Sequence, residues 1–452
     1  MTLLSAQIDA VSQVMPFGVC GRVQGVSGLT IEASDLPLPV GSLCRIESFG
    51  GRNSMAEVIG FQQERTLLMA LDAMGGISRG DTIQNIAAAP TIGCSMQLLG
   101  RVISGMGVPL DGKPAPPVSE PRRIDAKAVG CMDRTSINQP ISTSVRCIDG
   151  LHTCGLGQRM GIFSGPGVGK SILLSQIAKN TSADVSVVGL IGERGREVGE
   201  FLQHSLGEAG LKRCVVIVST GDEAPLLRVR AAKVACTVAE YFRDQGKHVL
   251  LLIDSLTRLA QAQRQIGLAA REPPATRGFP PSVFALLPQV LERAGKTARG
   301  SVTGFYTVLV EGDDFNEPIA DAVKGIVDGH LWLSRPLANR GHYPAIDVLQ
   351  SISRVRSQVA TPEQLRHARR VLALLAVFQE IEDLVNIGAY VPGNSAEHDL
   401  AVQARPRMIA FLQQDFTGPT TMIQATAQLK DLFGWIEQLE KTIKAQGAKK
   451  GK

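Results

Sequence analysis

The sequence has no long hydrophobic run and no paired cysteines, and each absence excludes a class of protein. None of its apolar runs reaches the roughly 18 residues that a membrane-spanning helix needs. The eight cysteines include no CxxC pair, which argues against a disulfide framework or a zinc site and indicates reduced thiols in the cytosol. The first ten residues, MTLLSAQIDA, contain no basic leader and include Asp9, so we do not expect a secretory signal.

Aromatic residues and excess charge are also scarce. Aromatic side chains make up 4% of the sequence, which leaves little stacking surface for single-stranded nucleic acid. The net charge is +5, and much of it lies in the C-terminal stretch KTIKAQGAKKGK, which we expect to be solvated and disordered. With 44% hydrophobic and 20% charged residues, the chain has the composition of an ordinary globular protein, long enough for two or three domains.

The N-terminal part predicts a helix followed by a small β-barrel. Over residues 1–16, apolar side chains recur at helical spacing, namely Leu4, Ile8, Val11 and Met15. Residues 17–92 then contain short β-branched segments bounded by turn residues: FGVCGRVQGVSGLTIEA, SLCRIESF, MAEVIGF and TLLMAL. Strands this short and regular are typical of a closed barrel. Further on, residues 113–123, KPAPPVSEPRR, are too rich in proline for a helix or a central strand and predict an extended connection.

The rest of the chain predicts an α/β domain over residues 93–357 and a helical domain over residues 358–452. The apolar strand candidates are MGIFS, VSVVGLIG, CVVIVS, HVLLLIDS and FYTVLVEG, and between them lie helical stretches such as ILLSQIAKN and APLLRVRAAKVACTVAEYFRDQG. The stretch EVGEFLQHSLGEAG also predicts a helix. Strands that are apolar on both faces indicate a parallel sheet covered by helices. Beyond residue 358 only amphipathic helical patterns remain.

The segment SGPGVGKS lies where a phosphate-binding loop belongs, after the strand candidate MGIFS and before the helix candidate ILLSQIAKN. Its glycines would let several backbone N–H groups converge on one anion at the start of the helix. Lys170 would reach the β- and γ-phosphates of a nucleotide, and the Ser171 hydroxyl would ligate Mg²⁺. The usual pattern begins with glycine, and Pro166 removes one donor, but the charge-bearing core is intact. The nucleotide-binding residues predicted here are Ser164, Gly165, Pro166, Gly167, Val168, Gly169, Lys170 and Ser171.

Two carboxylates follow buried strands and would complete a hydrolytic site. Asp254 ends the apolar run HVLLLIDS, which predicts a magnesium ligand; the alternative, an aspartate that caps the next helix, is less favoured beside Lys170. Glu193 follows VSVVGLIG, one helix and one strand beyond Lys170, at the sheet edge where open α/β sheets bind ligands. It would orient the attacking water; the alternative is a first-turn glutamate that favours the helix dipole.

Several segments resemble the catalytic subunit of rotary-type ATPases and occur in the same order along the chain as in that family. They are SGPGVGKS, GERGREVGEF, LLLIDSLTRLAQAQRQIG, EPPATRGFPPSVFALLPQVLERAG and YPAIDVLQSISRV. The upstream pieces LLGRVISGMGVPLDGKP and INQPISTSVRCIDGLHTCGLGQR are similar to the same family. Within that family, ATRGFPPSVFALLPQVLERAG and QEIEDLVNIGAYVPGNSAEHDLAV resemble the flagellum-specific type III protein export ATPase, a close relative of the injectisome secretion ATPases.

The resemblance implies a P-loop, RecA-like domain and a homohexamer with ATP bound at each subunit interface. It assigns Lys170 and Ser171 to phosphate and Mg²⁺, Asp254 to Mg²⁺ and Glu193 to the attacking water. Two further residues receive roles from the resemblance. Tyr343, in GHYPAID, would pack on adenine, and Arg354, in SISRV, would enter the neighbouring subunit's site as an arginine finger, whereas the residues alone favour a surface arginine.

The resemblance also implies partners and a location. The loop GFPPS, residues 278–282, would face a central stalk protein in the pore, although its prolines fit a rigid surface turn equally well. The N-terminal helix would dock a stator-like regulator, or equally pack on its own barrel. The implied function is Mg²⁺-dependent ATP hydrolysis that energises flagellar type III export, unloading and unfolding chaperone-bound substrates. Chaperone–substrate complexes and export-gate membrane proteins would be partners, in the cytoplasm at the inner face of the membrane.

Four other functions are compatible with parts of this sequence. An injectisome ATPase is not separated from a flagellar one by this sequence. An ATP synthase catalytic subunit would take its finger from a different chain, whereas here one chain carries both Glu193 and Arg354. A non-catalytic ring subunit usually lacks the carboxylate at the position of Glu193. An RNA translocase needs an aromatic, basic barrel, but residues 17–92 contain no Tyr or Trp, so no nucleic acid is expected as a partner.

Overall fold

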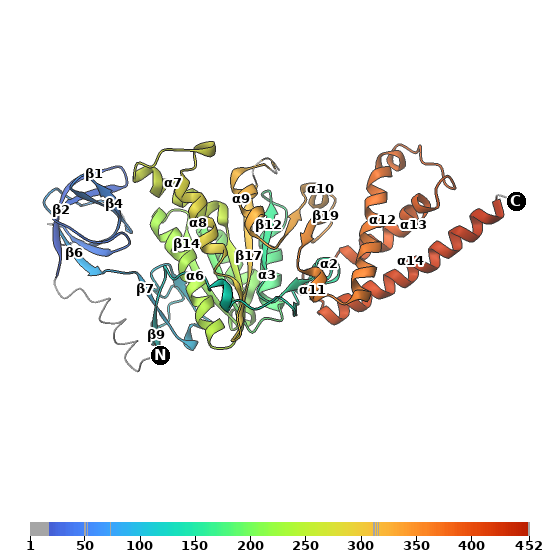
Figure 1. Cartoon of the computed structure of the whole chain (residues 1–452), viewed down its shortest axis with the longest axis horizontal. Coiled ribbons are helices and arrows are strands. Elements are labelled where there is room, and N and C mark those ends of the chain that lie inside the picture. Colours follow the sequence, from blue (N-terminus) through green and yellow to red (C-terminus); the bar gives the residue numbers. More distant parts are fainter. Residues whose placement is uncertain are drawn as a thin grey trace.

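In the computed structural model, residues 18–450 are described except residues 49, 50, 52, 73, 311, 313 and 315. A barrel, a sheet with helices on both faces and a group of C-terminal helices follow one another along the long axis of the molecule (Figure 1). This is the predicted α/β architecture with its small barrel and helical end. The helix predicted over residues 1–16 lies outside the described residues.

The barrel is closed by six strands in the order β1-β2-β5-β4-β3-β6. Their bounds are β1 (Cys20–Ser27), β2 (Thr30–Ser34), β3 (Leu43–Glu47), β4 (Asn53–Gln62), β5 (Arg65–Ala70) and β6 (Thr82–Ala87). Alternate side chains such as Val23, Ile31, Ile46 and Leu68 fill the interior, as the two-residue period of a strand requires. The strand β6 was not predicted, because TIQNIA carries only a weak apolar pattern.

A short connection leads from the barrel to the main sheet. The strands β7 (Thr91–Cys94) and β9 (Glu120–Arg123) pair in an antiparallel ladder of two strands. The predicted extended connection therefore ends in a strand, which accepts Pro121 because β9 has only one neighbour. A single turn of 3₁₀ helix, Met96–Leu98, follows β7.

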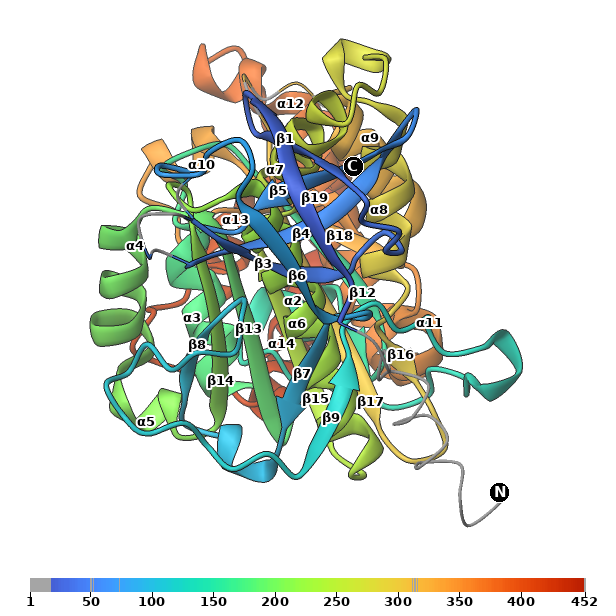
Figure 2. The same ribbon diagram turned by 90° about the vertical axis from the view of Figure 1, so that its left-hand side faces the viewer.

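The main sheet contains the predicted buried strands, and its order decides which loops meet. In order across the sheet they are β19 (Ile346–Ser353), β18 (Gly329–Leu333), β12 (Arg159–Ser164), β17 (Ser301–Leu309), β15 (His248–Asp254), β13 (Val185–Glu193), β14 (Cys214–Thr220) and β8 (Val102–Ser104). All neighbours are parallel except β18 and β19, and the short β16 (Gly295–Lys296) adds to β17. Figure 2 looks from the barrel end and shows these strands behind the barrel.

Consecutive strand residues point into two separate apolar cores, which explains why the strands are apolar throughout. Leu251 and Ile253 of β15 pack with α6 (Pro225–Asp244) and α7 (Leu256–Ala269) on one face. Leu250 and Leu252 face the other core, which contains α3 and the C-terminal helices. A sheet buried on both faces has no solvated side and therefore no polar alternation. The remaining helices of this part are α2 (Arg146–Leu151), α3 (Lys170–Asn180), α8 (Pro281–Leu291), α9 (Pro318–Ile326), α10 (Arg335–Asn339) and α11 (Arg356–Val359).

The helix expected from EVGEFLQHSLGEAG is broken into three pieces. The pieces are α4 (Gly195–Glu200), a π-helical turn (Phe201–Leu206) and α5 (Gly207–Leu211). Gly207 has a left-handed φ of 64°, which a regular helix does not contain. A single continuous helix was therefore the wrong prediction for this segment.

The C-terminal part consists of α12 (Pro362–Asn386), α13 (Ala396–Leu412) and α14 (Met422–Lys450), which pack on one another and on α2. No strand occurs here among the described residues, in agreement with the sequence. The disordered tail was a wrong prediction, because α14 runs to Lys450. Its later part is anchored by the buried side chain of Ile443 and by an ion pair between Lys444 and Glu440. None of the helices in the described ranges is long and apolar enough to span a bilayer.

A buried ion pair joins the connection before the main domain to two of its helices. Arg293, just after α8, donates from Nε to Oε1 of Glu240 on α6 at 2.8 Å, and both side chains are largely buried. The same guanidinium donates to the backbone oxygen of Ile124 at 2.8 Å and to the hydroxyl of Thr237. Two nitrogens of Arg293 contact the two carboxylate oxygens of Glu240, and this bidentate geometry offsets the free-energy cost of removing both charges from water.

We expect Arg293→Ala to lower the free energy of unfolding by about 3–5 kcal/mol, because it leaves Glu240 charged, buried and without its partner. Urea unfolding followed by circular dichroism measures the change. Arg299→Ala, on an exposed position nearby, should change stability by less than about 0.5 kcal/mol. Equal effects of the two substitutions would contradict the assignment of Arg293 as a structural clamp.

Candidate active site

The predicted phosphate-binding loop connects the end of β12 to the start of α3. Gly167 and Gly169 adopt left-handed φ values of 78° and 87°, which residues with a Cβ rarely adopt. No side chain caps the first turn of α3, so its leading N–H groups are not satisfied by a capping side chain. Together with the positive end of the helix dipole, these groups make a site for an anion.

One ammonium lies between two carboxylates at the carboxyl edge of the sheet. The Nζ atom of Lys170 forms an ion pair with Oδ1 of Asp254 and lies 3.7 Å from Oε1 of Glu193. The three side chains are only 6–11% exposed. They come from three separate elements, α3, β13 and β15. The structure therefore brings together three of the residues that the sequence assigned to this site.

A bulge in β13 turns Glu193 toward this cluster. The register of β13 against β14 shifts between Ile191 and Glu193, and Gly192 between them has a φ of 74°. A bulge re-aims the side chain that follows it. A Cβ on Gly192 would lie 2.9 Å from the Cβ of Arg258, which is closer than two such atoms normally approach. A larger residue at this position would therefore clash with Arg258.

The environment of Glu193 favours its neutral form. The pKa of Glu193 is raised to about 7, chiefly by burial and next by the negative charge of Asp254, with Lys170 acting in the opposite direction. Its Oε1 atom has no hydrogen-bond partner among the described residues. A carboxyl group with a near-neutral pKa and an oxygen that accepts no hydrogen bond from the described residues is suited to orient water and accept a proton from it.

Arg258, in the first turn of α7, is a part of the site that the sequence analysis missed. Its charge lowers the pKa of Glu193, and its buried Nε atom has no hydrogen-bond partner within the described part of the chain. Arg228 of α6 lies beside it, and the pKa of Arg228 is lowered by burial and by the like charge of Arg258. The available signal was the position of Arg258, one helical turn after Asp254 in IDSLTR.

The donor set at this edge fits Mg²⁺ bound together with a nucleotide. Asp254 offers carboxylate oxygens, and the exposed Ser171 follows Lys170 in the first turn of α3. Mg²⁺ prefers such oxygen ligands and commonly completes its shell with phosphate and water. Within the described ranges, no group of three or more His, Cys, Asp or Glu side chains could hold a metal ion unaided.

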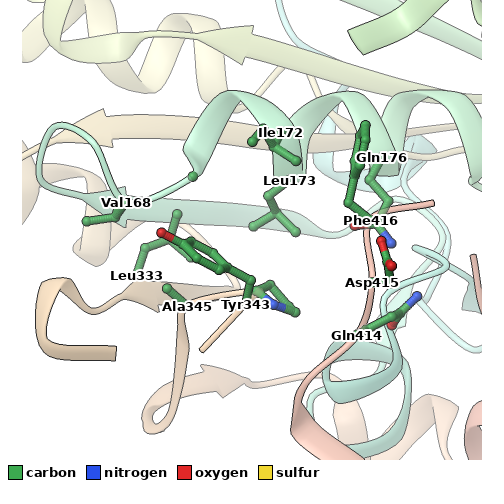
Figure 3. Close-up of a pocket in the computed structure, with 12 residues that line it drawn as sticks. Val168, Ile172, Leu173, Gln176, Leu333, Tyr343, Ala345, Gln414, Asp415 and Phe416 are labelled. Carbon is green, nitrogen blue, oxygen red and sulfur yellow. The ribbon is translucent and has the colours of Figure 1, made fainter. Parts of the chain in front are cut away.

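A cavity of about 290 Å³ adjoins the phosphate loop (Figure 3). Its walls come from the loop and α3, from the segment after α10 and from the segment after α13, and they are mostly apolar. The lining residues are Val168, Gly169, Ile172, Leu173, Gln176, Leu333, Tyr343, Pro344, Ala345, Gln414, Asp415 and Phe416. The ring of Tyr343 lies against Gly169, 3.4 Å from where a Cβ would stand. A mostly apolar cavity of this kind beside a phosphate-binding loop is a candidate site for a small ligand.

The wall supplied by the segment after α13 was not predicted. The backbone N–H of Gln414 donates to the carbonyl of Tyr343 at 3.0 Å, and its side-chain amide donates to the carbonyl of Ser144 at 2.9 Å. These bonds hold Asp415 and Phe416 at the cavity. The only hint in the sequence was an aromatic residue inside the polar stretch QQDFTGPT, which has no periodicity to mark it.

Arg354 does not belong to the same cluster. Arg354 directly follows Ser353, the last residue of β19, and Ser353 pairs with Gly329, the first residue of β18. The strand β18 runs parallel to β12, so the two strands begin at the same edge of the sheet. Arg354 therefore lies level with the start of β12, whereas the phosphate loop follows the other end, roughly 20 Å away at the rise of a strand. Its exposed side chain donates to the carbonyl of Val327 at 3.3 Å.

Three family models match the chain. Residues 23–86 match the beta-barrel domain of the ATP synthase alpha/beta family, and residues 144–353 match the nucleotide-binding domain of that family. Residues 360–431 match the T3SS EscN ATPase C-terminal domain.

The relatives and the solved structures agree with these matches. The flagellum-specific ATP synthase of Bacillus subtilis is 47% identical over 94% of this chain and 98% of its own length. The SPI-2 type 3 secretion system ATPase of Salmonella typhimurium is 46% identical over 92% of this chain and 96% of its own length. The assembled ATPase EscN of the enteropathogenic E. coli type III secretion system is 42% identical, with a TM-score of 0.86 over 91% of this chain and 100% of that chain.

We expect Glu193→Gln to stabilise the protein free of metal and nucleotide by about 1–3 kcal/mol at pH 8 and to have little effect at pH 5. The folded protein raises the pKa of Glu193, so folding favours the protonated form, and the stability of the parent falls as pH rises toward 7. The amide has no charge to bury. Urea unfolding at the two pH values measures the difference.

The control is Asp254→Asn, which should lower stability because it removes the ion-pair partner of Lys170. The prediction fails if Glu193→Gln is less stable than the parent at pH 8, or if its effect is the same at both pH values.

Proposed function

This chain belongs to the ATP synthase alpha/beta family, in the group of flagellum-specific and type III secretion ATPases, and we propose that it hydrolyses ATP with Mg²⁺ to energise the export of flagellar proteins. The observation that carries the chemistry is the cluster of Lys170, Asp254 and Glu193 beside the phosphate loop. The domain boundaries proposed for this enzyme are 1–16, 17–92, 93–357 and 358–452, and the three family matches fall within the last three of these ranges.

We assign the phosphate-binding role to the loop at residues 164–171. Its backbone N–H groups and Lys170 would hold the phosphates, and Ser171 and Asp254 would hold Mg²⁺. The metal, when bound, neutralises charge on the phosphates. Glu193 would orient a water molecule for in-line attack and accept its proton. Its raised pKa supports this role, as does its Oε1 atom, which accepts no hydrogen bond from the described residues.

We propose that the cavity beside Gly169 binds adenine. Tyr343 would pack on the base, as the sequence resemblance implied, and Phe416 would close the pocket from the side of the C-terminal helices. Aromatic side chains are effective in such a position because they bury large apolar area around a planar ring.

We propose that Arg354 acts in the site of a neighbouring subunit in a homohexamer. Its distance from its own phosphate loop supports action in a second chain, because an arginine side chain does not span about 20 Å. The similar protein EscN has been solved as an assembled ATPase and also in complex with its central stalk EscO, at 41% identity and a TM-score of 0.85. A central stalk facing the loop at residues 278–282 is the corresponding proposal for this chain.

The remaining partners and the location rest on family membership. We propose work in the cytoplasm at the inner face of the cell membrane, with export-gate proteins and chaperone–substrate complexes as partners. A stator-like regulator would bind residues 1–16. The injectisome is the alternative setting, since flagellar and injectisome relatives have similar identities, for example 47% and 46%. The flagellar role is favoured by the flagellar names of several relatives.

We expect Glu193→Gln to reduce kcat for ATP hydrolysis by about 10² or more while ATP binding stays within a few fold, because the amide keeps its size but does not accept a proton. Steady-state kinetics and binding of a fluorescent ATP analogue measure the two effects. The control is Glu200→Gln on α4, whose side chain is 54% exposed and pairs with Arg196, and which should leave turnover near that of the parent. Turnover of Glu193→Gln near the parent value would remove Glu193 from the mechanism.

We expect Arg354→Ala to lower kcat by about 10³ or more with little change in nucleotide affinity, since the finger acts on charge in the transition state. Mixing makes the test specific. A Lys170→Ala subunit offers a finger without a working pocket, and an Arg354→Ala subunit offers the reverse, so mixed rings should recover part of the activity. If native mass spectrometry detects mixed rings and no activity returns, the proposed role in a neighbouring site is wrong.

A further inference from the structure

Thr307 lies beside Asp254 on the neighbouring strand. Ile253 of β15 pairs with Tyr306 of β17, so the next residues along the two parallel strands, Asp254 and Thr307, stand side by side. The hydroxyl of Thr307 donates to Oδ1 of Asp254 at 2.7 Å. Thr307 is fully buried. A hydroxyl that donates to a carboxylate forms one of the stronger kinds of hydrogen bond.

Both donors to Asp254 among the described residues reach the same oxygen. Lys170 and Thr307 each contact Oδ1, and this leaves Oδ2 for another ligand. Two contacts to one oxygen fix the rotation of the carboxyl group about its terminal bond. The orientation of Oδ2 therefore depends on these two residues.

Lys170 and Thr307 are expected to respond differently when a nucleotide binds. Lys170 belongs to the phosphate loop, and its ammonium is drawn toward the phosphates when a nucleotide binds. Thr307 carries no charge, and a β-branched side chain packed in a strand has little rotational freedom. Its hydroxyl is thus the donor that stays on Asp254 in both states.

We infer that Thr307 is a positioning residue, whose hydroxyl holds the Asp254 carboxylate in the orientation that binds the divalent cation of the metal–nucleotide complex. This inference rests on the proposed ATPase function and adds to it a residue that reaches the metal only through Asp254. Partners of this kind typically contribute 10–100-fold to metal affinity.

The same strand provides a matched control. Thr303 is also fully buried and lies on the same face of β17, but its hydroxyl has a different partner. Its hydroxyl accepts a hydrogen bond from the backbone N–H of Gly157 at 2.9 Å, at the opposite end of the strand from Asp254. The Thr307 hydroxyl also lies 3.3 Å from the backbone oxygen of Ile253, but its shorter contact is with Asp254. Each substitution to valine removes one buried hydroxyl, and only the Thr307 hydroxyl contacts the Asp254 carboxylate.

The test compares Thr307→Val, Thr307→Ser and Thr303→Val. Binding of Mn²⁺ in the presence of a non-hydrolysable ATP analogue is measured by electron paramagnetic resonance, and binding of the analogue alone is measured in EDTA. We expect Thr307→Val to weaken Mn²⁺ binding by about 10-fold or more, with the metal-free affinity for the analogue unchanged. Thr307→Ser should restore Mn²⁺ binding to within about 3-fold, and Thr303→Val should leave it unchanged.

The inference is overturned if Thr307→Val binds Mn²⁺ like the parent, if Thr303→Val weakens binding equally, or if the serine does not rescue. Should Thr307→Val fail to fold, the pair Thr307→Ala and Thr307→Ser gives the same comparison, because only the serine keeps the hydroxyl. An unmodified protein that binds the metal–nucleotide complex but does not hydrolyse ATP would refute the proposed function and leave the metal-binding result for Thr307 to be judged separately.

Discussion

The ion pair between Lys170 and Asp254 is the contact around which the site is arranged, and the order of the strands makes it possible. The loop that carries Lys170 follows β12, and Asp254 ends β15, with β17 between these two strands. The ion pair therefore spans the carboxyl end of β17, and Thr307 of β17 donates to Asp254 at this point. On the far side of β15, the bulge at Gly192 brings Glu193 to the same ammonium. A parallel sheet supplies all of these groups at one edge because all its carboxyl ends point the same way.

The crowding of charge at this edge of the sheet opposes the stability of the fold. Two carboxylates lie near one ammonium, and the Oε1 atom of Glu193 accepts no hydrogen bond from any residue that the structure describes. The like charges of Arg228 and Arg258 also lie close enough to lower the pKa of Arg228. Sites that must bind a highly charged ligand are commonly held in such a state. The apolar cores on both faces of the sheet, together with clamps such as the Arg293 ion pair, offset this cost away from the site.

The parts that the sequence predicted are those with a local signal. Buried strands, the glycines of the loop and the carboxylates that end strands are each marked by neighbours in the chain. Phe416 and Gln414 were missed because their role comes from a turn that reaches the cavity only after folding. The broken helix over Gly195–Leu211 was missed because its residues have ordinary helical patterns. The helical tail was missed because lysine and alanine suit a solvated end and a helix alike, and only the burial of Ile443 distinguishes them.

The cavity next to the phosphate loop has walls from two parts of the chain that belong to different layers. Gly169 and Tyr343 come from the sheet domain, whereas Phe416 comes from the turn between α13 and α14. A ligand that touches both walls resists their separation, and a force that pulls the C-terminal helices away from the sheet must weaken that ligand's binding by the same free energy. The cavity therefore lies at the contact between the sheet domain and the C-terminal helices. Under the proposed assignment of this cavity to adenine, a load that separates the C-terminal helices from the sheet would lower nucleotide affinity, and a bound nucleotide would oppose that separation.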